Sequence, residues 1–86
     1  RARVLIVPRH EGIVTKSYVE LIVEMPGVRE NNIGLSVHDN AIHIDAISED
    51  GYKRYTGKAI PRVRIQPAPE SMQYLNGILR ARFRRV

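Results

Sequence analysis

Two alternating apolar runs on either side of Asp39-Asn40 constrain this chain more than any other feature. A two-residue turn at Asp39-Asn40 would pair Val37 with Ile42, Leu35 with Ile44 and Ile33 with Ala46. All three pairs are apolar and share a face, whereas a slip of one residue would bury Ser36 and His43. Asn also tolerates the positive φ that a type I′ turn requires. The sequence therefore predicts a β-hairpin over residues 33–46.

The segment from Ser71 to Val86 fits two structures. As a helix, it would place Met72, Leu75, Leu79 and Phe83 on one stripe opposite arginines, which suits a membrane surface. Against the helix, Gly77 would lie in its interior at a cost of up to ~1 kcal/mol relative to Ala. Asn-Gly is also a leading hairpin signal. We therefore predict a hairpin in which Tyr74 faces Leu79 and Met72 faces Ala81, with Phe83 inward and the arginines outward.

A third extended run reaches from Ile13 to Met25 and ends at Pro26-Gly27. Pro fixes φ and Gly supplies the positive φ of a type II turn, so the strand should end there. Its apolar side is predicted to consist of Val19, Leu21, Val23 and Met25.

The rest of the chain reads as short strands and turns. Strands are expected at Val4–Val7, at Tyr52–Ile60 as an edge or the approach to one, and over Val63 and Ile65. Glu11-Gly12 is expected as a turn, and Arg29–Asn32 as a loop. Seven or eight strands with turns every 8–12 residues predict an all-β fold, an antiparallel immunoglobulin-like β-sandwich.

Composition narrows the function classes. The 86 residues form one domain and contain no cysteine, which excludes disulfides and thiolate–metal sites. No apolar run is long enough to span a membrane, and the glycines are too scattered for a phosphate loop that would bind ATP. The formal charge of +5 allows nucleic-acid binding, but the arginines at 80, 82 and 84 lack interleaved aromatics, so a salt-bridging outer face is expected.

Two clusters of polar residues invite chemical interpretations. Ser36, His43 and Asp45 share the outer face of the first hairpin, but a triad there would lack an oxyanion hole and a dry pocket, so catalysis is not expected. His38 and His43 could be diagonal neighbours that, with Asp45, catch a stray zinc ion. A specific site needs three or four ligands, so no metal site is predicted.

The order of these motifs resembles the α-crystallin domain of small heat-shock proteins. The resemblance rests on Met25-Pro26-Gly27-Val28, the Asp39-Asn40 hairpin, Ile60-Pro61 and Tyr74-x-Asn76-Gly77-Ile78-Leu79. Within these, Pro26, Gly27, Asn76, Gly77 and Leu79 are the motif positions. Residues 1–86 would then be the domain, with flanking N- and C-terminal regions absent or trimmed. The loop after Ile47 is shorter than the strand-swapping loop of many family members.

The resemblance implies an ATP-independent chaperone, or holdase, that binds exposed apolar segments of unfolding proteins. It implies a cytoplasmic, self-associating protein with no enzymatic activity, cofactor, small-molecule substrate or membrane partner. The implied partner-binding groove consists of Ile33, Leu35 and Val37 on one side and Met72 and Tyr74 on the other. A co-chaperone or scaffold module similar to the CS domain is an alternative, and a basic nucleic-acid-binding module is a further one.

Overall fold

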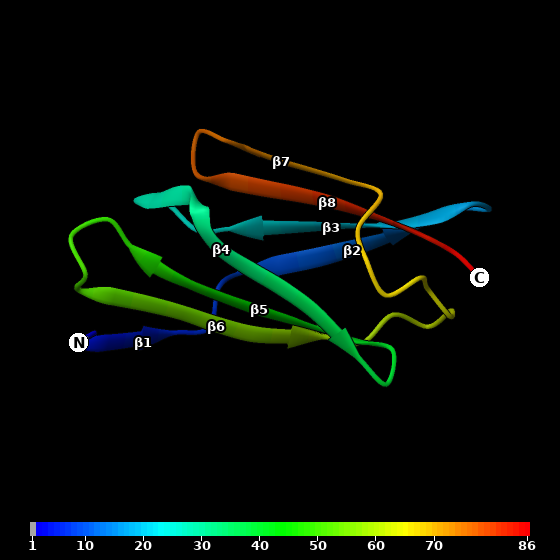
Figure 1. Cartoon of the computed structure of the whole chain (residues 1–86), viewed down its shortest axis with the longest axis horizontal. Coiled ribbons are helices and arrows are strands. Elements are labelled where there is room, and N and C mark those ends of the chain that lie inside the picture. The colour runs from blue at the N-terminus through cyan, green and yellow to red at the C-terminus, as the bar shows by residue number, and fades with distance from the viewer. Residues whose placement is uncertain (1) are drawn as a thin grey trace.

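A computed structural model describes residues 2–86 as two four-stranded β-sheets packed face to face (Figure 1). The strands are β1 (Val4–Ile6), β2 (His10–Val14), β3 (Tyr18–Glu24), β4 (Val28–His38), β5 (Ala41–Ser48), β6 (Lys53–Ala59), β7 (Ser71–Leu75) and β8 (Ile78–Arg84). One sheet has the order β1-β6-β5-β4, and the other has the order β2-β3-β8-β7. All pairs are antiparallel except β1 with β6. The all-β sandwich is confirmed.

Both predicted hairpins form in the predicted register. Strands β4 and β5 pair Val37 with Ile42 and Leu35 with Ile44, and their turn residues Asp39 and Asn40 have φ of 50° and 64°. Strands β7 and β8 pair Tyr74 with Leu79 and Met72 with Ala81. Asn76 and Gly77 have φ of 52° and 81°, as a type I′ turn requires. The segment from Ser71 to Val86 is therefore not helical.

The core lies between the sheets and is made by one side of each central strand. On β3 and at its end, Val19, Leu21, Val23 and Met25 are at most 3% exposed, as the alternation predicted. They meet Leu79, Ala81 and Phe83 from β8, and Ile42, Ile44 and Tyr55 from the opposite sheet. Phe83 is fully buried, so the inward direction predicted for it is confirmed.

Two predictions near the N-terminus were wrong. Glu11-Gly12 is not a turn, because both residues lie inside β2, opposite Ile22 and Leu21. The run from Ile13 to Met25 is not one strand but the end of β2, a tight turn, and β3. At that turn the Thr15 backbone N–H donates to the Tyr18 carbonyl oxygen at 2.8 Å, and the Thr15 hydroxyl accepts from the Tyr18 N–H at 3.1 Å. A threonine hydroxyl thus supplies the turn contacts for which glycine or proline is the usual signal.

Four boundaries also differ from the prediction. Arg29–Asn32 is not a loop, because β4 begins at Val28; the register with β5 shifts between Val28 and Ile33, which is a bulge. Val7 lies outside β1. Strand β6 is paired with both β1 and β5 over residues 54–55, so it is not a simple edge. Val63 and Ile65 form no strand, and Ile65 makes only an isolated bridge to Arg85.

Candidate functional site

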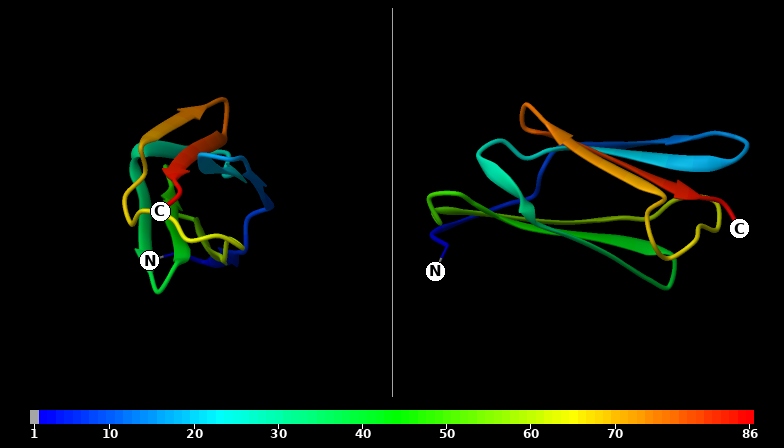
Figure 2. Two further views of the ribbon diagram at one scale, coloured as in Figure 1. Left: turned by 90° about the vertical axis from the view of Figure 1, so that its right-hand side faces the viewer. Right: turned by 45° about the horizontal axis from the view of Figure 1, so that its top comes forward.

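Strands β4 and β7 are the edges of their respective sheets and lie on the same side of the sandwich (Figure 2). Within residues 2–86, β4 pairs with β5 alone and β7 pairs with β8 alone. Each strand therefore presents a row of backbone N–H and C=O groups that no other strand satisfies. Such an edge can accept a further extended segment by main-chain hydrogen bonding.

The five residues predicted to line a groove all lie on these two strands. Ile33, Leu35 and Val37 alternate along the inward side of β4, where they are half-buried and pack against the core. On β7, Tyr74 is also half-buried against the core, whereas Met72 is 38% exposed. Four of the five thus combine core contact with partial access from solvent, and Met72 adds an exposed apolar side chain. The surface formed by these five residues is called the β4–β7 surface below.

At one end of this surface, Tyr74 links the Pro26-Gly27 turn to the Asn76-Gly77 turn. Its hydroxyl donates to the Met25 carbonyl oxygen at 2.6 Å and accepts from the Val28 N–H at 3.4 Å. The Met25 N–H in turn donates to the Gly77 carbonyl oxygen at 2.8 Å. These contacts join the Pro26-Gly27 turn to the β7–β8 turn, although the two motifs are about 50 residues apart.

Gly77 is required at this junction for two reasons. Its φ of 81° is one that side chains with a Cβ rarely adopt, and an added Cβ would lie 3.2 Å from the Pro26 Cα. The sequence identified Pro26, Gly27, Asn76 and Gly77 as turn residues. That the two turns touch depends on how the sheets pack, and nothing in the local pattern could have shown it.

The other end of the β4–β7 surface carries a hollow of about 550 Å³. Its lining residues are Val37, Asp39, Asn40, Arg64, Ile65 and Pro67. Of the five predicted groove residues, Val37 alone lines it. The segment that follows β6 therefore forms a wall of this hollow, which the sequence analysis did not predict.

Asn40 holds that segment in place. Its side-chain amide donates from Nδ2 to the Val63 carbonyl oxygen at 2.9 Å, and its Oδ1 accepts from the Ile65 N–H at 3.0 Å. The amide thus imitates a neighbouring strand's backbone and satisfies two backbone groups of a segment that otherwise makes only the isolated bridge of Ile65 to Arg85. The sequence predicts Asn40 as a turn residue but not this second role, for which the available signal is an Asn where Gly is more common.

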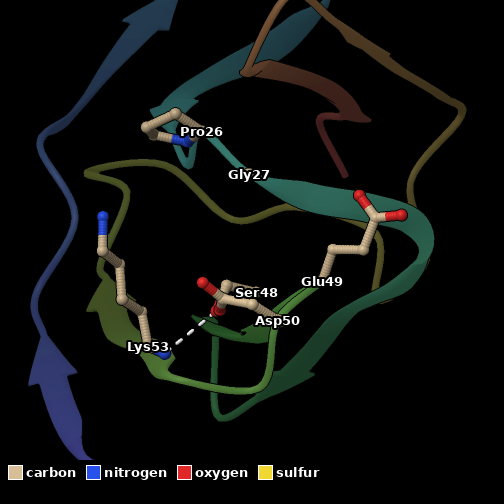
Figure 3. Close-up of a pocket in the computed structure, with 6 residues that line it drawn as sticks. All are labelled: Pro26, Gly27, Ser48, Glu49, Asp50 and Lys53. Carbon is tan, nitrogen blue, oxygen red and sulfur yellow. Dashed lines mark hydrogen bonds between the residues drawn. The ribbon is translucent and has the colours of Figure 1, made fainter.

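A second hollow, of about 390 Å³, lies beside the Pro26-Gly27 turn and is also lined by Ser48, Glu49, Asp50 and Lys53 (Figure 3). The Ser48 hydroxyl donates to Asp50 at 2.6 Å and accepts from the Lys53 backbone N–H at 2.9 Å. The Ser48 hydrogen bond, and next the one from the Tyr52 N–H, lower the pKa of Asp50 below its usual 3.8. These contacts close the turn between β5 and β6, so a structural role accounts for them.

The three arginines on the outer face of β8 have partners. Arg80 lies 3.6 Å from Glu20, Arg84 lies 3.6 Å from Glu70, and the Arg82 guanidinium lies 4.0 Å from the centre of the Tyr18 ring. The predicted salt-bridging outer face is confirmed by these contacts. Glu20 and Glu70 therefore offset part of the positive charge of this stripe.

The suggested Ser36–His43–Asp45 cluster is not assembled for catalysis. Both Asp45 carboxylate oxygens accept hydrogen bonds from Arg54, at 2.9 and 3.1 Å, which also raises the pKa of Arg54. Ser36 lies opposite His43 in the ladder, on the outer face of the sheet. No group of three His, Cys, Asp or Glu side chains that could hold a metal ion occurs in residues 2–86. Nor does that part of the chain contain a helix long and apolar enough to cross a membrane.

Solved structures of small heat-shock proteins share this fold, although no family model and no curated protein matches the sequence. Heat shock protein 16.0 from Schizosaccharomyces pombe superposes with a TM-score of 0.78 at 16% identity, over 94% of this chain and 68% of its own. A mutant of hsp14.1 from Sulfolobus solfatataricus P2 gives 0.80 at 14% identity, over 92% and 75%. The hspA of Xanthomonas axonopodis gives 0.76 at 18% identity, over 92% and 93%. The chain therefore has the α-crystallin-like fold of small heat-shock proteins.

Proposed function

We propose that this chain is an ATP-independent holdase that binds extended apolar segments of unfolding proteins on the β4–β7 surface. The observation that carries the proposal is that two open strand edges, one from each sheet, flank half-exposed apolar side chains on the same side of the molecule. An extended segment gains main-chain hydrogen bonds from such an edge and places alternate side chains against the apolar residues. No bond is made or broken, so no catalytic group, cofactor or small-molecule substrate is involved.

Similarity of the fold to small heat-shock proteins supports the same proposal. On the basis of this similarity we also propose that the protein self-associates and is located in the cytoplasm. The connection between β5 and β6 spans residues 49–52, so it holds no extra strand to exchange with a partner. Self-association would therefore use the exposed edges rather than an exchanged loop.

That short connection also favours a second candidate, a co-chaperone or scaffold module similar to the CS domain. Such a module would dock one partner through an outer sheet face instead of binding many clients at an edge. Nucleic-acid binding has less support, because Arg80, Arg82 and Arg84 are already engaged by Glu20, Tyr18 and Glu70.

Suppression of light scattering from a thermally aggregating model protein tests the holdase proposal. The wild-type chain should reduce scattering equally with and without ATP. Met72→Asp should abolish the reduction, because a carboxylate at this position would oppose burial of an apolar client segment. Gln73→Asp adds the same charge to the next residue of β7, on the outer face, and should leave the reduction intact.

Strand β4 offers a second matched pair. Leu35→Asn should weaken the protection, whereas Ser36→Asn, one residue further on the outer face, should not. Circular dichroism would verify that each variant is folded. Unchanged scattering at an equimolar amount of the wild-type chain would contradict the holdase, and equal loss in both members of each pair would place the binding site elsewhere.

A further inference from the structure

Two histidines lie side by side on the outer face of the β4–β5 hairpin, opposite in direction to the β4–β7 surface. His38 is opposite Ala41 and His43 is opposite Ser36, so the two histidines are diagonal neighbours across the ladder. Their ring centroids are 5.7 Å apart and the ring planes cross at 65°. His38 is exposed and His43 is half-buried, so solvent reaches both rings.

Neither of these two rings hydrogen-bonds to another group within residues 2–86. Within residues 2–86, the third histidine, His10, has its Nδ1 2.9 Å from the Pro8 carbonyl oxygen. The rings of His38 and His43 have no such contact with described protein atoms, so their nitrogens remain available to a ligand. The backbone beneath them is held by a two-residue turn with both φ values positive, which fixes the spacing of the two side chains.

We infer that His38 and His43 form a two-ligand site for a zinc, copper or nickel ion. A metal 2.0–2.1 Å from one nitrogen of each ring, in tetrahedral geometry, holds the two ring centroids roughly 5 Å apart. The observed separation of 5.7 Å is close to this distance, so side-chain rotation alone can bring both nitrogens onto one ion. The sequence predicted no metal site. We revise that expectation because the two rings lie close together and their nitrogens are free.

The surroundings restrict the class of ion. The Asp45 carboxylate on the same face is held by Arg54, and Lys58 lies opposite His43, so Asp45 is not free to act as an oxygen ligand. Imidazole suits zinc, copper and nickel, whereas calcium and magnesium require oxygen ligands. Water is expected to complete the coordination of the bound ion.

A bound ion would stabilise the fold by linking β4 to β5. An ion held by both histidines links β4 to β5 across the ladder, on the face opposite Leu35 and Val37. Because it binds only when the hairpin has formed, it should raise the thermal unfolding temperature. This inference concerns a different face from the proposed client surface and does not depend on it.

Calorimetric titration of the whole chain with zinc chloride, and separately with nickel chloride, tests the site. The wild type should bind about one ion per chain. His38→Asn and His43→Asn should each lose saturable binding and the metal-dependent rise in unfolding temperature. The matched control His10→Asn should retain both, because its ring lies on the other sheet. Circular dichroism without metal would verify that the variants are folded.

A spectroscopic measurement on the wild type avoids any effect of substitution on folding. Nuclear magnetic resonance should show zinc-dependent changes in the ring proton signals of His38 and His43, with those of His10 unaffected. The inference is overturned if the wild type shows no saturable binding, if both histidine variants bind as well as the wild type, or if His10→Asn abolishes binding.

Discussion

The central strands β3 and β8 and the edge strands β4 and β7 are all amphipathic, yet their inward side chains have different surroundings. On β8, Leu79, Ala81 and Phe83 are completely buried. On β4, Leu35 and Val37 are only half-buried, although they alternate in the same way. The difference arises because β3 and β8 are paired on both sides, whereas each edge strand lacks a neighbour on one side.

An apolar residue can therefore stabilise the fold or remain accessible to a partner, depending on its strand. A leucine in the central pair gains the full transfer free energy and supports the fold. A leucine on an edge gains only part of it and leaves the remainder available to a visiting segment. Stability and the binding that we propose therefore draw on different strands of the same sandwich.

Alanine substitutions at three leucines test the difference between central and edge strands. They should give the largest change in the free energy of unfolding. Leu79→Ala removes a fully buried side chain and should lower the free energy of unfolding by about 3–5 kcal/mol. Leu35→Ala should cost about 1–2 kcal/mol, because that side chain is only partly buried. Leu75→Ala, at a position 60% exposed, should cost less than about 0.5 kcal/mol. Urea denaturation measures all three, and equal costs for Leu79→Ala and Leu35→Ala would remove the distinction between centre and edge.

Asn40 and Asn76 offer a smaller and more local test. Both residues have positive φ, so replacing either by Ala adds a similar backbone strain. Asn40→Ala also leaves the Val63 carbonyl and the Ile65 N–H unpaired, and should cost about 1–3 kcal/mol more than Asn76→Ala.

Amide hydrogen exchange should locate the effect of Asn40→Ala. Faster exchange is expected at Ile65 and along the C-terminal half of β4, with β3 and β8 unchanged at early times. If the amides of β8 lost protection together with Ile65, the edge and the centre would unfold as one unit.

The smallest expected effect is that of acid on the turn between β5 and β6. The pKa of Asp50 is lowered in the folded chain, so its contribution to stability is present above pH 3.8 and is lost as the pH falls through the lower, folded value. Asp50→Asn should therefore reduce the loss of unfolding temperature between pH 6 and pH 3. The Tyr52 carbonyl accepts from the N–H groups of Arg3 and Val4, so the β1–β6 edge should respond first. An unchanged pH dependence in Asp50→Asn would contradict this role.

Much of the fold could be predicted because its strongest signals are local. Asp39-Asn40 and Asn76-Gly77 each favour a tight turn, and the apolar alternation on either side permits one register. The errors have a local cause as well. Thr15 forms its turn through a hydroxyl, and Gly12 lies within a strand, so residue type alone misplaced the boundary between β2 and β3.

Less of the candidate site than of the fold could be predicted from the sequence. Its five residues lie on the two edge strands, as the resemblance implied, but the hollow at one end shares only Val37 with them. Arg64 and Pro67 reach that hollow because Asn40 holds their segment. A contact between residues 23 and 25 positions apart leaves no periodic trace in the sequence.

The sequence by itself determined most of the strands, the two hairpin registers and the identity of the buried faces, since turn chemistry and a two-residue period act between near neighbours. The tertiary structure alone decided which strands became edges, that β1 runs parallel to β6, and that the Pro26-Gly27 and Asn76-Gly77 turns meet through Tyr74. Those outcomes depend on how two finished sheets pack over a shared core, which is a property of the whole chain and of no single segment.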